Sequence, residues 1–138
     1  MRALIFLLLL TAVEAADLPL VQPKDVAAQL AGGSKPVVLY VGPNVLYRSK
    51  HIPGAAFAGP GARPEGIELM KNSVASLARD REIVLYCGCC PWDRCPNIRP
   101  AVELLRSMGF KQVKAMYLPT DFKADWIDKG YPVEAGAR

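Results

Sequence analysis

The chain has 138 residues, a formal net charge of +4 and four cysteines. This length predicts a single domain that buries a sufficient core without disulfides or metals, so the cysteines are free to serve a function. Lysines and arginines are scattered along the chain rather than grouped into a basic stripe. This pattern argues against nucleic acid as a partner and is compatible with small anionic ligands.

The first fifteen residues have the features of a secretory signal peptide. Arg2 gives a positive start, residues 3–10 form an unbroken apolar run, and Ala15 ends a small-residue cleavage site. The run is shorter than the roughly 20 apolar residues that a spanning helix needs, so an uncleaved membrane anchor is the weaker alternative. We expect residues 1–15 to be removed and residues 16–138 to form a domain that is exported, periplasmic or secreted, without a stable membrane anchor.

Strands and helices are predicted to alternate along the remainder of the chain. Turn residues and the periodicity of apolar side chains define the boundaries of each element. The expected strands are 18–21, 36–41, 55–58, 83–86 and 113–117. The expected helices are 23–30, 65–79, a third from Asn97 as its N-cap to Gly109, and 121–129, with 42–50 as a loop.

Apolar runs without alternation, such as residues 37–41, are typical of strands covered on both faces. Together with short connections, they predict an α/β fold with a central, mostly parallel sheet of about five strands and helices on both faces. Ligands of such sheets bind beyond the C-terminal ends of the strands. Cys87 follows the strand 83–86 directly, so we expect a site there.

All four cysteines lie within residues 87–95. Disulfides among them would close very small loops and add little stability, so a structural role is the weaker interpretation. The segment leads into a predicted helix, whose N-terminal N–H groups and dipole favour an anion. The sequence therefore predicts a place where a thiolate is stabilised and can react.

Three fragments of the sequence resemble the rhodanese-like sulfurtransferase family. They are the string His51-Ile52-Pro53-Gly54-Ala55, the strand end Leu85-Tyr86-Cys87, and the closing set Trp126, Gly130, Pro132 and Val133. The resemblance covers nearly the whole mature chain and implies the three-layer rhodanese-like fold. It also implies a catalytic cysteine that takes sulfane sulfur from a donor such as thiosulfate, carries it as a persulfide, and passes it to cyanide or a thiol. No cofactor is implied.

The resemblance favours Cys87 as the residue that carries the sulfur, because it directly follows the strand. Cys89 and Cys90 are its competitors, and Cys89 has the family's usual separation from Arg94. The loop between strand and helix is longer here than in the family. We expect Gly88 and Arg94 to bind the anionic substrate and Trp92 to shape the pocket.

A second difference from the family lies after the second predicted strand. Many members carry an aspartate and an arginine at two places that hold Tyr40 and Gly42 in this sequence. Arg48 or Arg63 would then have to supply the missing charge. His51, the only histidine, is expected in a structural turn rather than in catalysis.

Two other functions remain open from the residues alone. Cys87 and Cys90 form a C-x-x-C pair, which would suit an exported dithiol redox carrier with a redox partner protein. Four thiols also suit copper or zinc, although structural zinc sites usually take two separated ligand pairs. We favour sulfur transfer, with a small anionic sulfur donor and a thiol acceptor as partners and no metal or cofactor.

Overall fold

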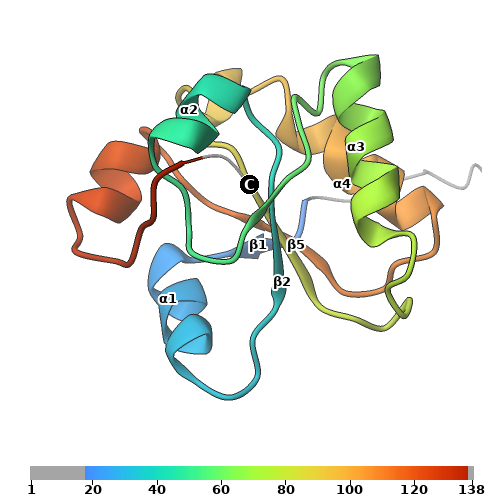
Figure 1. Cartoon of the computed structure of the whole chain (residues 1–138), viewed down its shortest axis with the longest axis horizontal. Coiled ribbons are helices and arrows are strands. Elements are labelled where there is room, and N and C mark those ends of the chain that lie inside the picture. The colour runs from blue at the N-terminus through green and yellow to red at the C-terminus, as the bar shows by residue number, and fades with distance from the viewer. Residues whose placement is uncertain (1–17, 137–138) are drawn as a thin grey trace, which may run out of the picture.

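The computed structural model describes residues 18–136 (Figure 1). The signal peptide expected at residues 1–15 lies outside the described residues. Within the described part, no helix is both long and apolar enough to cross a bilayer. The chain alternates between strands and helices, as the sequence predicted.

The elements follow one another with short connections. In chain order they are β1 (Leu20–Val21), α1 (Pro23–Ala31), β2 (Val37–Tyr40), α2 (Asn44–Ser49), β3 (Ala56–Phe57), α3 (Pro64–Val74), β4 (Ile83–Tyr86), the 3₁₀ turn η1 (Trp92–Arg94), α4 (Ile98–Ser107), β5 (Val113–Met116) and the π-helical turn η2 (Lys123–Ile127).

The described residues form one parallel sheet of five strands in the order β1-β5-β4-β2-β3. The central strands β2 and β4 pair over all four residues, so that Tyr40 lies opposite Tyr86. Both strands therefore end at the same edge of the sheet. The prediction of a parallel α/β sheet of about five strands is confirmed.

Helices cover both faces of this sheet. In Figure 1, α1 and α2 lie on one side of the strands and α3 and α4 on the other. Because side chains alternate along a strand, β4 contributes Leu85 to the core under α3 and α4, and Tyr86 to the opposite core. Cys87 continues this alternation and joins the α3 and α4 side.

Two of the expected helices have different bounds. The helix predicted for residues 65–79 begins at Pro64 and ends at Val74. Its buried residues are Gly66, Met70 and Val74, and the next two residues are exposed, so the helical face that packs on the sheet ends there. The helix predicted for residues 121–129 is reduced to η2, in which Trp126 is buried and its Nε1 donates to the Pro132 carbonyl at 2.9 Å.

The prediction of a loop over residues 42–50 was wrong, because α2 forms there. The Pro43 carbonyl accepts hydrogen bonds from the N–H groups of Leu46 and Tyr47 and so starts the helix. Tyr47 is buried, and its hydroxyl donates to the Ala55 carbonyl at 2.8 Å. Val45 is 72% exposed, so the apolar residues of this segment do not form the buried stripe with helical spacing from which a helix is predicted.

His51 holds the C-terminal segment against α2. Its Nδ1 lies 2.7 Å from the Tyr47 carbonyl oxygen, and its Nε2 lies 2.9 Å from Glu134 Oε1. The backbone groups of His51 and Glu134 also exchange hydrogen bonds. The histidine is thus engaged in the fold, as expected for a structural turn.

Candidate functional site

Cys87 lies at the C-terminal end of β4, where the sequence placed the site. Its side chain is only 2% exposed, because it continues the inward-facing row of Ile83 and Leu85. The next residue, Gly88, has a φ of +68°, which turns the chain sharply. A Cβ at Gly88 would lie 2.7 Å from Phe122 Cβ and 2.8 Å from Phe122 N, so only glycine fits.

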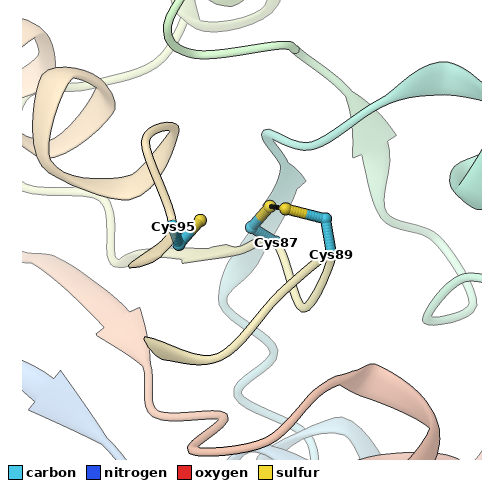
Figure 2. A group of neighbouring side chains, drawn as sticks. All are labelled: Cys87, Cys89 and Cys95. Atoms are coloured by element: carbon cyan, nitrogen blue, oxygen red, sulfur yellow. Dashed lines mark hydrogen bonds between the residues drawn. The ribbon is translucent and has the colours of Figure 1, made fainter. Parts of the chain in front are cut away.

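The turn at Gly88 brings Cys89 back towards Cys87. The Cys87 thiol donates a hydrogen bond to Cys89 Sγ at 3.2 Å (Figure 2). Cys95 extends towards the same point from the segment before α4, and the Sγ atoms of Cys87, Cys89 and Cys95 all lie within 4.8 Å of one another. Cys89 Sγ also lies 3.0 Å from Cys90 Sγ. All four cysteines are free thiols.

The thiols differ in how readily they ionise. Hydrogen bonding from Cys87 lowers the pKa of Cys89 to about 5, with Cys90 and Cys95 acting in the same direction. Hydrogen bonding from Cys87 also lowers the pKa of Cys95, to about 7. The pKa of Cys87 is raised, because its proton is held by Cys89 and Cys95 and its sulfur is buried. At neutral pH Cys89 is therefore the most fully ionised of these thiols.

Cys90 is the outermost member of the group. Desolvation and its hydrogen bond with Cys89 raise the pKa of its thiol. Cys89 lies between the two members of the predicted C-x-x-C pair, in contact with both. The contacts therefore favour Cys89 as the partner for either Cys87 or Cys90 in a dithiol.

Asn97 connects the cysteines to the rest of the fold. It holds the N-cap position of α4, as predicted, but within the described residues its side chain makes no capping bond. Instead its Oδ1 accepts from the N–H of Ala62 at 3.1 Å, and its Nδ2 donates to Cys87 Sγ at 3.6 Å and to Cys89 Sγ at 3.9 Å. Sequence reasoning missed this contact, although a buried amide beside a cysteine loop must find partners.

A pocket of about 410 Å³ opens beside the sulfurs. Cys87, Gly88 and Cys89 form part of its wall. The remaining lining combines apolar side chains with two lysines and one aspartate: Tyr40, Leu46, Ser49, Lys50, Asp121, Phe122, Lys123 and Ile127. The pocket can therefore accept an anion that also carries an apolar part.

Tyr40 lines this pocket, and Gly42 lies against both Tyr40 and Cys87. A Cβ at Gly42 would lie 2.5 Å from the Tyr40 hydroxyl oxygen and 2.9 Å from Cys87 Sγ, so an arginine side chain has no room at this position. The Tyr40 hydroxyl is buried and has no hydrogen-bond partner among the described residues. Neither Arg48 nor Arg63 lines this pocket, so the tyrosine rather than an arginine faces the sulfurs.

The other expected substrate-binding residues separate into two groups. Gly88 lines the pocket. Arg94 is exposed in η1 and does not line it. The Trp92 ring packs edge-on against Tyr117 with centroids 5.2 Å apart, and its backbone N–H donates to the Pro119 carbonyl. Trp92 therefore anchors the loop to the segment that follows β5 and is not among the residues that line the pocket beside Cys89.

Comparisons with known proteins agree on the fold. No protein-family model matches the chain, and no curated protein matches it. Among solved structures, the Alr3790 protein from Anabaena sp. is 24% identical with a TM-score of 0.66, covering 86% of this chain and 94% of that one. The rhodanese-like domain of Alr3790 is 26% identical with a TM-score of 0.62, covering 85% of this chain and 79% of that one.

A third structure supports the same conclusion. The polysulfide-sulfur transferase homodimer from Wolinella succinogenes is 16% identical with a TM-score of 0.64, covering 88% of this chain and 81% of that one. The parallel five-stranded sheet and the helices on both of its faces are consistent with these likenesses. This chain is a rhodanese-like domain in its fold.

Proposed function

We propose that this protein transfers sulfane sulfur and that Cys89 carries the sulfur as a persulfide. The observation that carries the proposal is the position of Cys89, which lies in the pocket wall and accepts a hydrogen bond from Cys87. Its lowered pKa, about 5, makes it a thiolate at neutral pH. Cys87, favoured by sequence position, is better suited to hold the proton, because it is buried and its pKa is raised.

The reaction begins when the Cys89 thiolate attacks the outer sulfur of a thiosulfate-type donor. A sulfur–sulfur bond forms to Cys89 while the donor's own sulfur–sulfur bond breaks, and sulfite leaves with the electron pair. An acceptor thiolate then attacks the outer sulfur of the persulfide, and the Cys89 thiolate departs. The cysteine is regenerated without a cofactor.

Several groups around the pocket support these steps. Lys50 and Lys123 offer positive charge to an anionic donor. The Tyr40 hydroxyl is a buried donor without a partner among the described residues. It can donate a hydrogen bond to the negatively charged outer sulfur of the persulfide on Cys89. The neighbour from Wolinella succinogenes is described as a polysulfide-sulfur transferase, which is chemistry of the same class. The signal-like residues 1–15 support an exported site of action.

Dithiol exchange is a second candidate, favoured by one observation. Cys89 Sγ lies 3.2 Å from Cys87 Sγ and 3.0 Å from Cys90 Sγ, so an oxidant could join it to either. In that case the reactive pair would include Cys89 rather than consist of Cys87 and Cys90.

The two candidates are separated by measuring intact mass after incubating the fully reduced protein with thiosulfate or with inorganic polysulfide. Sulfur transfer predicts a gain of one sulfur atom that a cyanide wash removes and that Cys89→Ser abolishes. Cys90→Ser is the matched control and should keep the adduct. An adduct that survives in Cys89→Ser but not in Cys87→Ser would assign the sulfur to Cys87. Loss of two protons without any sulfur gain would favour dithiol exchange.

A further inference from the structure

We propose that Cys87, Cys89 and Cys95 also form a three-coordinate site for a soft monovalent metal ion, and that the preferred ion is Cu(I). The inference goes beyond sulfur transfer, because it concerns the binding of a metal ion by the same sulfur atoms. It rests on how three thiols from separate parts of the backbone converge: one at the end of β4, one in the loop, and one before α4.

The distances suit a trigonal arrangement of sulfurs. The three Sγ atoms lie within 4.8 Å of one another. A metal–sulfur bond of about 2.3 Å places the sulfurs of a planar three-coordinate site roughly 4 Å apart. Cys87 Sγ and Cys89 Sγ, now 3.2 Å apart across a shared proton, would separate slightly when the metal replaces that proton. Binding therefore releases thiol protons and requires no oxidant.

The number of ligands favours copper over zinc. In residues 18–136 this is the one group of three or more Cys, His, Asp or Glu side chains whose ligand atoms meet this closely, and Cys90 is not a member. Structural zinc sites are almost always four-coordinate, whereas soft thiolates select Cu(I). The only histidine, His51, is engaged with Tyr47 and Glu134 and does not approach the sulfurs as a fourth ligand.

The surroundings supply the outer partners that thiolate ligands require. Asn97 Nδ2 points at two of the sulfurs, 3.6 Å from Cys87 Sγ and 3.9 Å from Cys89 Sγ. Cys95 lies shortly before α4, which begins at Ile98, so the positive end of the helix dipole is near its sulfur. The amide and the helix dipole offset the net negative charge of three thiolates around one monovalent ion.

Apolar packing covers the inner side of the site, opposite the pocket that Cys87 and Cys89 line. Cys87 belongs to the core between the sheet and the helices α3 and α4, and Cys89 and Cys95 pack against that core together with Trp92. A metal ion bound there would occupy Cys89 and so prevent its attack on a sulfur donor. Metal binding and sulfur loading are therefore mutually exclusive.

The test is an anaerobic titration of the fully reduced chain with Cu(I) in competition with the chromogenic chelator bicinchoninate. One ion is expected to bind per chain. Cys95→Ser, which alters a half-buried residue, is expected to lower the affinity by more than the roughly 10- to 100-fold that loss of an outer partner costs. Cys90→Ser is the matched control and should bind as the unaltered protein does.

Two outcomes would overturn the proposal: no stoichiometric binding to the unaltered chain, or an equal loss of affinity in Cys90→Ser and Cys95→Ser. X-ray absorption on the unaltered, Cu(I)-loaded protein provides a measurement that needs no variant. Three sulfur neighbours are expected, and a two-sulfur site would contradict the assignment. Because the titration contains no sulfane donor, failure of the proposed sulfur transfer would leave its result unchanged.

Discussion

The Cys87 thiol donates a hydrogen bond to Cys89 Sγ across 3.2 Å, so the more buried sulfur keeps the proton and the more exposed one becomes the anion. The strand thus places a proton donor, and the loop that follows places the nucleophile. This division of roles between two neighbouring cysteines makes a direct prediction about pH.

Alkylation of Cys89 should follow a thiolate with a pKa of about 5. Because the thiolate fraction grows as pH rises through the pKa, the rate should rise about tenfold per pH unit below this value and level off above it. Peptide mass spectrometry after brief iodoacetamide treatment from pH 4 to pH 9 would measure it. Cys87→Ala removes the main donor and should move the midpoint up towards the ordinary cysteine pKa of about 8.5. An unchanged midpoint would show that Cys87 does not set the acidity of Cys89.

Tyr40→Phe should separate stability from activity. The Tyr40 hydroxyl is buried without a partner among the described residues, so its removal should raise the free energy of unfolding by about 1 kcal/mol. Sulfur loading should slow by about tenfold, the worth of one hydrogen bond to a charged group. Urea unfolding measures the change in stability, and intact mass at timed intervals after adding thiosulfate measures the rate of sulfur loading. A parallel fall in stability and loading would instead indicate a structural role.

Gly88→Ala should be costly for two reasons, the positive φ and the contact with Phe122. We expect a loss of more than about 2 kcal/mol of unfolding free energy, because the left-handed backbone alone costs roughly 1–2 kcal/mol. Gly54→Ala is the matched control, since Gly54 has a φ of +79° and a Cβ there would meet nothing within 4 Å. Equal losses in the two variants, compared by thermal unfolding, would mean that the approach to Phe122 does not matter.

Asn97 offers a test of the link between the sulfurs and the loop that contains Ala62. Asn97→Ala leaves the Ala62 N–H without its acceptor and should destabilise the protein by about 1–3 kcal/mol. Asn97→Asp keeps that acceptor but places a negative charge beside two sulfurs. Its stability should be closer to that of the unaltered protein, whereas the pKa of Cys89 should rise.

The alkylation profile of Asn97→Asp would check that second effect. Like charges disfavour ionisation, so the midpoint should lie above that of the unaltered protein. A midpoint that stays near pH 5 would mean that the amide has no electrostatic contact with Cys89.

The frame of the protein could be predicted because its main elements carry strong patterns. β4 is an unbroken apolar run, and α4 buries Ile98, Ala101, Val102 and Leu105 on one face, so both were expected at nearly their observed bounds. α2 was missed because its apolar residues Val45 and Leu46 are exposed and give no periodicity. Its one buried residue is Tyr47, whose hydroxyl bonds to the Ala55 carbonyl eight residues later, a contact that apolar periodicity does not reveal.

The position of the cysteines at the end of β4 could be predicted, but the contacts among them could not. The strand end and the cluster of thiols are both visible in the sequence. The reversal at Gly88, which brings Cys89 onto Cys87, depends on the backbone and on the approach of Phe122. Arg94 was expected to bind substrate from its spacing, but the 3₁₀ turn and the packing of Trp92 on Tyr117 leave it outside the pocket.

The alternation of side chains along β4 has a consequence for how this loop can vary. A one-residue insertion within the strand would turn Cys87 away from α4 and into the opposite core, which contains Tyr86 and Trp126. Extra residues between Gly88 and Asn97 would leave this alternation unchanged, because Gly88 is bonded to Phe122 and Asn97 to Ala62 at the two ends of the segment. Proteins with the same sheet could therefore differ in the sequence and length of this segment. Such differences would change the chemistry at the C-terminal edge of the sheet and leave the core unchanged.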